Sequence, residues 1–186
     1  MIDIEILDVH PSTSNIKWIS WIPKKINLFI WRLNSDRIRI RSNLTKRSVN
    51  LDSTICPLCL SNSEDVDHLF TRCRHTIPLW RSLNDLWNTS NSILNGVSND
   101  IRLAALDSIS KTEKCLRLAT HYVLLWLIWK WRNKMVHATQ EKRSEILNED
   151  IMSSLRVLSH LWISNRSSKI GSDYEEWMKC PRSAVT

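Results

Sequence analysis

Glycine and proline are scarce in this chain, which has 186 residues but only 2 Gly and 5 Pro. A fold of many short strands needs frequent turns, and these two residues are the ones that most often make them. Their scarcity argues against a many-stranded β fold. Leu-, Ile- and Trp-rich segments with apolar residues three and four positions apart favour helices instead. We therefore predict a mainly α-helical protein, of a length that suits one domain or two small ones.

Long apolar runs and a secretory signal are also missing. The longest apolar run, Tyr122–Trp129, is too short to span a bilayer and is closed by Lys130 and Arg132. The segment Met1–Val9 is acidic and lacks the basic start of a signal peptide. We expect an intracellular protein of the nucleus or cytoplasm that is neither secreted nor in contact with a membrane.

Common catalytic motifs are absent from the sequence. It contains no Gly-x-Ser-x-Gly, no Walker loop and no His-Glu-x-x-His. It also has no pair of adjacent aspartates, and two-metal polymerisation requires clustered carboxylates. We therefore predict no catalytic residues and no enzymatic activity for this chain alone.

Four residues within a short stretch have the spacing of a zinc site: Cys56, Cys59, His68 and Cys73. The Cys-x-x-Cys turn can direct both sulfurs at one ion, and thiolate and imidazole are the donors that zinc prefers. Four protein ligands leave no position for water, so we predict one structural Zn²⁺. Two alternatives stay open: His75 can replace Cys73 as the fourth ligand, and the cysteines can be buried thiols or a redox pair.

The other cysteines have less defined roles. The total of five is odd, and no secretory signal accompanies it, which favours a reducing compartment with cysteines used for metal. Cys115 lies in an apolar segment and is predicted to be a small core residue. Cys180 lies near the end of the sequence and is predicted to be an exposed free thiol.

Positive charge is concentrated in one segment. The formal net charge is +7, and the segment Lys24–Arg47, with eight cations and the single anion Asp36, accounts for all of it. A neutral body with one basic segment suits a partner with a phosphate backbone. The alternative is a solvated basic face. The candidate nucleic-acid contacts are Lys24, Lys25, Arg32, Arg37, Arg39, Arg41, Lys46 and Arg47.

Tryptophan is abundant, with 10 Trp against 2 Phe and 2 Tyr. Aromatic rings between cations can stack on the bases of single strands, whereas rings at helical spacing are usually buried. Trp18, Trp21 and Trp31 flank the basic segment and are candidates for base contact. The tryptophans at core spacing are Trp80, Trp87, Trp126, Trp129 and Trp162.

The order of these segments predicts four regions: an N-terminal extension (1–17), a zinc-binding domain (18–90), a helical region (98–166) and a polar, loosely ordered tail (167–186). A polar linker at 88–98 separates the two central regions. The segment Arg37–Arg41 alternates like a strand edge but suits an extended connector equally well. The first expected helix begins at Pro23. The other expected helices cover Ser42–Arg47, Glu64–Arg72, Thr76–Trp87, Ile101–Ile109, Glu113–His137 and Ser144–Ser164.

The motifs resemble a known family. Trp21–Arg32 is similar to a W-x-P-x-K-x-x-x-F-x-W-R signature, and it is followed in order by Asp36-Arg37-Ile38, Arg41–Leu44, Lys46-Arg47, Cys56–Cys59, Glu64–Cys73 and Leu79-Trp80. This order resembles the zinc-binding domain found C-terminal to the polymerase of plant LINE-type, non-LTR retrotransposon reverse transcriptases. The resemblance covers Trp18–Trp87, and Trp126–Asn133 is similar to a W-x-x-W-K-x-R-N helix of longer members. His137 departs from the phenylalanine common there.

The resemblance implies a module separated from its polymerase. It selects Cys73 over His75 as the fourth ligand and implies the element's RNA or its target DNA as the partner, with the polymerase region as a further one. The alternative function is a zinc-stabilised scaffold for protein interactions that makes no contact with nucleic acid.

Overall fold

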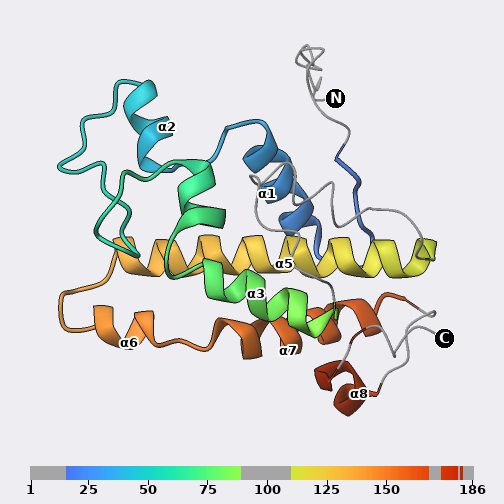
Figure 1. Cartoon of the computed structure of the whole chain (residues 1–186). Coiled ribbons are helices and arrows are strands. Elements are labelled where there is room, and N and C mark those ends of the chain that lie inside the picture. The colour runs from blue at the N-terminus through green and yellow to red at the C-terminus, as the bar shows by residue number, and fades with distance from the viewer. Residues whose placement is uncertain (1–15, 89–109, 168–172, 180, 182–186) are drawn as a thin grey trace, which may run out of the picture.

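The helical prediction is confirmed by a computed structural model, which describes residues 16–88, 110–167, 173–179 and 181 (Figure 1). Within those ranges the β contacts are limited to one isolated bridge between Ile55 and Ser63. The helical elements in chain order are α1 (Lys24–Asn34), α2 (Arg41–Lys46), η1 (His68–Arg72), α3 (Ile77–Leu86), α5 (Lys111–Val136), α6 (Arg143–Leu147), α7 (Ile151–Ser164) and α8 (Tyr174–Lys179).

Helix α5 is the axis of the fold. It has 26 residues, and the Ser110 side chain caps its first turn by accepting a hydrogen bond from the Glu113 backbone N–H. Residues Tyr122–Leu125 are all buried, so apolar side chains point in every direction around the helix. Accordingly, α1 packs on one side of α5, and α6 and α7 pack on the opposite side (Figure 1).

Helix α1 begins one residue after Pro23, close to the predicted start, and its entry loop is fixed by Asn27. The buried Asn27 side chain accepts from the Ile19 N–H and donates to the Ile19 carbonyl, both at 2.9 Å. Ile26, Ile30 and Leu33 then face the core at helical spacing. Asn27 thus satisfies backbone groups that burial would otherwise leave unpaired.

The alternating segment after α1 is an extended connector that joins no sheet within the described residues. Ile38 and Ile40 are 4% and 0% exposed, whereas Arg37 and Arg39 are exposed. Successive side chains of an extended chain point to opposite sides, so the isoleucines anchor the connector while the arginines face solvent. The alternation in the sequence thus corresponds to alternating burial, but the segment does not pair with a strand within the described residues.

The single helix predicted over Ser144–Ser164 is wrong, because α6 and α7 replace it. The break falls before Asp150, whose carboxylate accepts a 2.9 Å hydrogen bond from the Ser153 N–H. Aspartate at this position satisfies an unpaired donor of the new helix and lies in its favourable dipole field. The apolar spacing continues across the break, which explains why periodicity alone did not detect it.

The tail is also more structured than expected. Helix α8 packs against α7 through Trp177, which is 0% exposed and donates a 3.3 Å hydrogen bond from Nε1 to the Ser159 hydroxyl. His160 of α7 lies against the same indole at 5.7 Å between ring centroids. A short helix is marginal by itself, so this indole is what holds α8 in place.

Replacing Trp177 with alanine should detach α8 and destabilise the protein by about 3–5 kcal/mol, the usual cost of removing a buried large aromatic. Urea unfolding followed by circular dichroism measures this loss. The matched control is Tyr174→Ala, because Tyr174 lies on the same helix but is 44% exposed. Equal effects of the two substitutions would contradict the anchoring role of Trp177.

One hydrophobic core contains residues from both predicted central regions. Ile26, Ile30 and Leu69 from the first region belong to the same buried cluster as Leu124 and Ile128 from the second. The four region boundaries stay predictions, and both residues 89–98 of the linker and the predicted helix Ile101–Ile109 lie outside the described residues. No helix in the described ranges is long and apolar enough to cross a membrane.

Candidate metal centre and adjoining basic pocket

The structure brings together the four predicted metal ligands. The sulfurs of Cys56, Cys59 and Cys73 and one ring nitrogen of His68 all lie within 4.8 Å of one another, and all four residues are buried. The Cys59 Sγ and the His68 Nε2 are 3.3 Å apart. In a tetrahedral site with Zn–S bonds of about 2.3 Å, ligand atoms are roughly 3.8 Å apart. The cluster therefore has the size of a zinc site.

The first pair of cysteines lies on a tight turn held by backbone hydrogen bonds. The Leu60 N–H bonds to the Cys56 carbonyl at 2.9 Å, and the Cys56 N–H bonds to the Asn62 carbonyl at 2.7 Å. Leu60 has a φ of 54°, a left-handed conformation that is unfavourable for a leucine, and its side chain is 64% exposed. The bridge between Ile55 and Ser63 closes this loop.

The second pair lies at the ends of a π-helical turn. The Cys73 N–H bonds to the His68 carbonyl at 2.7 Å, an interval of five residues. In an α-helix, positions five apart are rotated by about 140°, so both side chains could not face one ion. The wider π turn brings His68 and Cys73 to the same side. Turns of this kind are frequent at functional sites.

The buried side chains of the cluster shift one another's protonation. The hydrogen bond from the Cys56 thiol to Cys73 raises the pKa of Cys56, as burial also does, and the same hydrogen bond lowers the pKa of Cys73. Burial also lowers the pKa of His68, which favours the neutral imidazole. Neutral imidazole and thiolate are the forms that bind zinc. Three sulfurs and one nitrogen, buried together, fit one structural Zn²⁺ held entirely by protein.

The rival ligands lie elsewhere. His75 packs against Trp131 with 6.2 Å between ring centroids, and its Nε2 accepts a hydrogen bond from Arg74 at 3.3 Å. Cys115 is half-buried in α5, where burial raises the pKa of its thiol. Cys180 lies outside the described residues. Cys73 rather than His75 therefore completes the cluster.

A buried ion pair connects the metal loop to α5. Arg132 donates from its Nε to one oxygen of Glu64 at 2.7 Å and from a terminal nitrogen to the other oxygen at 2.6 Å. The Glu64 carboxylate also accepts the Arg41 N–H at 2.9 Å. A second link is the 2.9 Å hydrogen bond from Arg143 to the Pro57 carbonyl, inside the Cys-x-x-Cys turn. The metal loop is thus fixed to α5 through Arg132 and to α6 through Arg143.

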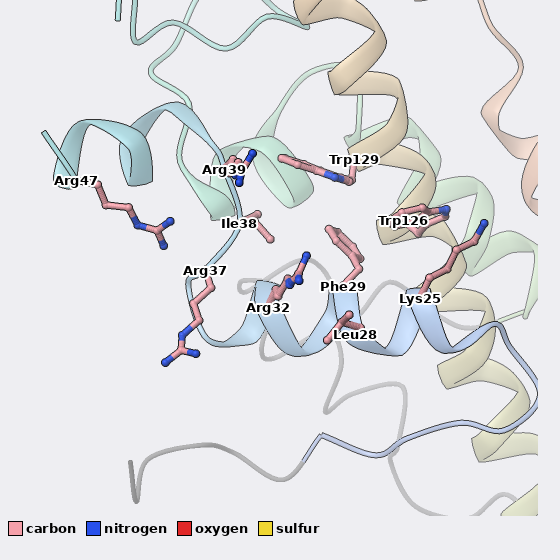
Figure 2. A pocket seen from close by; sticks show the side chains of 10 residues that line it. All are labelled: Lys25, Leu28, Phe29, Arg32, Arg37, Ile38, Arg39, Arg47, Trp126 and Trp129. Atoms are coloured by element: carbon pink, nitrogen blue, oxygen red, sulfur yellow. The ribbon is translucent and has the colours of Figure 1, made fainter. Parts of the chain in front are cut away.

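A pocket with a volume of about 740 Å³ lies between α1, the connector and α5 (Figure 2). We call it the basic pocket, and its lining residues are Lys25, Leu28, Phe29, Arg32, Arg37, Ile38, Arg39, Arg47, Trp126 and Trp129. The lining includes five cations and no acidic residue of the described chain. Neither hydrogen bonds nor ion pairs join these cations to a carboxylate of the described residues. The pocket therefore attracts anions.

The structure divides the eight predicted nucleic-acid contacts into two groups. Lys25, Arg32, Arg37, Arg39 and Arg47 line the basic pocket, whereas Lys24 lies exposed on α1 outside it. Arg41 is half-buried and donates to the Ser53 carbonyl at 3.0 Å. Lys46 forms a 3.1 Å ion pair with Asp36. Arg41 and Lys46 thus already have partners within the protein.

Two tryptophans assigned to the core by their spacing pack against it and also line the basic pocket. Trp126 and Trp129 are half-buried, whereas Trp80 and Trp87 are 3% and 1% exposed. The two rings are three positions apart and so lie on one side of α5, which the sequence shows. Because α5 is apolar on all sides, its periodicity did not indicate that this side is open.

The three tryptophans that flank the basic segment lie outside the pocket lining. Trp18 is 56% exposed and Trp21 is half-buried. Trp31 is half-buried and carries the Arg37 guanidinium over its ring at 5.3 Å from the centroid. Of the three, Trp31 is therefore the one linked to a cation of the pocket.

Residues 7–80 match the model of a protein family described as zinc-binding in reverse transcriptase. The matched segment contains the whole metal cluster and all five cations of the basic pocket, and it ends before α5. No curated protein and no solved structure matches the chain. The family described is a zinc-binding one, which agrees with the geometry of the cluster.

Proposed function

We propose that this protein is a zinc-stabilised nucleic-acid-binding module, related to the region that follows the polymerase in LINE-type retrotransposons of plants. Its partner is the RNA of such an element or the DNA at its target site, and its role is binding rather than catalysis. The family match and the motif order support the relationship. The observation that carries the binding function is the basic pocket, with five cations that have no carboxylate partner in the described chain.

The arrangement of the cations suits a phosphate backbone. Arg37 and Arg39 project from a connector that buried isoleucines anchor, and Arg47 follows the short helix α2. Guanidinium groups bind phosphate through paired hydrogen bonds, which suits them to this task better than ammonium groups. Because the connector is fixed by burial, little ordering entropy opposes the contact.

The binding function predicts a steep dependence on salt. If five phosphates are neutralised on a single strand, the affinity should fall on the order of 100-fold between about 50 and 200 mM salt. Fluorescence anisotropy of labelled mixed-sequence RNA and DNA with the zinc-loaded full chain measures this slope. An affinity independent of salt would contradict the proposal.

Charge-matched variants locate the contact. Replacing Arg37, Arg39 and Arg47 together by glutamine should reduce the salt slope by about 2, since each phosphate on a single strand contributes roughly 0.7. The control replaces three exposed cations outside the pocket, Arg81, Lys142 and Lys179, by glutamine and removes the same charge. Equal weakening by both triple variants would indicate a response to net charge alone. Unchanged binding in the pocket variant would favour the scaffold function.

A further inference from the structure

We propose that the basic pocket receives an unpaired nucleobase against Trp126 and Trp129, so that the protein prefers single-stranded RNA or DNA to a duplex. This inference rests on the proposed nucleic-acid-binding function and names the form of nucleic acid that the pocket selects. The pocket combines two walls of different chemistry, and each wall fits one part of a nucleotide.

The first wall is aromatic. Figure 2 shows Phe29 pointing from α1 toward Trp126 and Trp129 of α5. The Phe29 ring lies 5.3 Å from Trp126 at an angle of 69°, and 6.0 Å from Trp129 at 27°. Phe29 itself is only 5% exposed. The two indoles therefore pack against a largely buried ring, and both line the pocket.

One cation lies beside each indole. The Arg132 guanidinium lies 5.2 Å from the centroid of Trp129, and its side chain is 7% exposed and pairs with Glu64. Arg132 is not among the residues that line the pocket, whereas Trp129 is. Lys25 lies 6.0 Å from the centroid of Trp126 but is exposed, so it can move aside and contact a phosphate.

The second wall is cationic. Arg32 comes from α1, Arg37 and Arg39 come from the connector, and Arg47 follows α2 (Figure 2). Bases that stack on aromatic rings beside a positively charged surface are the usual arrangement in proteins that bind single strands. The pocket volume of about 740 Å³ lies within the range of small-molecule sites, which is sufficient for a nucleotide.

The aromatic wall is what discriminates between single strands and duplexes. A base inside a duplex is stacked on both faces, so it cannot pack against a protein ring unless it leaves the stack. The cationic wall alone would bind the phosphates of either form. A preference for single strands therefore indicates contact with the bases. A loss of binding to both forms indicates loss of the phosphate contacts made by the cations.

The test compares oligonucleotides of one length on the zinc-loaded full chain at one salt concentration. The probes are single-stranded RNA, single-stranded DNA, the DNA duplex, and a single strand whose sugars lack bases. We expect both single strands to bind on the order of 10-fold more tightly than either the duplex or the abasic strand, the usual effect of stacking one base. The RNA and DNA arms distinguish a role of the 2′-hydroxyl.

Variants then assign the contact to the indoles. Trp126→Leu and Trp129→Leu should each lower single-strand affinity on the order of 10-fold, and Trp126→Phe and Trp129→Phe should restore most of it. The matched control is Trp162→Leu, because Trp162 is also half-buried but lies on α7 outside the pocket. Circular dichroism and zinc content verify that each variant is folded, and the abasic probe tests the inference on the unmodified protein.

The outcomes separate this inference from the proposed function. Equal or tighter binding of the duplex, or an abasic strand that binds as well as the intact one, would overturn the base pocket while leaving nucleic-acid binding in place. Indole variants that are folded and bind like the unmodified protein would do the same. If none of the probes binds, the proposed function fails and this inference fails with it.

Discussion

Removal of the metal is expected to abolish cooperative folding of all the helices that the structure describes, including those that contribute no ligand. Structural zinc sites supply about 10–16 kcal/mol of binding free energy, whereas a typical domain has a net stability of about 5–15 kcal/mol. The loss of zinc is therefore comparable to the entire stability. Because Cys56, Cys59 and Cys73 belong to the same core cluster as Leu124 and Ile128, the effect should extend to α5.

The experiment compares Cys56→Ser with the unmodified protein by thermal unfolding and native mass spectrometry. We expect one zinc per chain in the unmodified protein, no zinc in the variant, and loss of its cooperative transition. Cys115→Ser is the matched control, since Cys115 lies outside the cluster. A variant that loses zinc but keeps the cooperative unfolding of α5 would show that the two predicted central regions fold independently.

Breaking the ion pair between Arg132 and Glu64 should be among the most damaging substitutions outside the metal cluster. Arg132→Met leaves the carboxylate of Glu64, whose side chain is 0% exposed, buried without its cation, and such losses cost about 3–5 kcal/mol. Urea unfolding followed by tryptophan fluorescence measures the change in the free energy of unfolding. The double variant Arg132→Met with Glu64→Gln should recover much of the stability, because the buried charge is gone and an acceptor for the Arg41 N–H remains.

Lys134→Met provides the control for the same experiment. Lys134 pairs with Glu149 at 2.6 Å, the same distance as the shortest contact of Arg132 with Glu64, but the side chains are 49% and 33% exposed. Exposed pairs contribute about 0–1 kcal/mol. If the two substitutions destabilise the protein equally, burial is not what makes the Arg132 pair important.

The metal cluster could be predicted from the sequence because its information is local. The ligand types and the spacings within Cys56–Cys73 are properties of one short stretch. The π turn that aligns His68 with Cys73 was missed, because propensities describe α-helices and the turn is set by the positions of its two ends. The ligands were thus predictable, whereas the backbone that presents them was not.

The features that the sequence did not predict depend on contacts between residues that are distant in sequence. Glu64 and Arg132 are 68 residues apart, and no periodicity relates them. Within the basic segment, charge counting treated all cations alike, but Lys46 is paired with Asp36, and Arg41 is bound to Ser53 twelve residues away. Tertiary contacts therefore decide which charges face solvent. The same contacts leave Trp126 and Trp129 at an open surface of a helix that is otherwise enclosed.

If the basic pocket binds nucleic acid as proposed, the Glu64 carboxylate links that equilibrium to zinc binding. It lies at the end of the metal loop, accepts the backbone N–H of Arg41, and holds the guanidinium that supports Trp129. If bound zinc helps to order this carboxylate, it also helps to order Arg132 and therefore the Trp129 side of the aromatic wall. Thermodynamic reciprocity then requires that a nucleic acid bound at the pocket raise the affinity of the cysteines for zinc by the same factor. On this proposal, zinc limitation would also lower the occupancy of the pocket, and nucleic acid bound at the pocket would raise the equilibrium occupancy of the metal site.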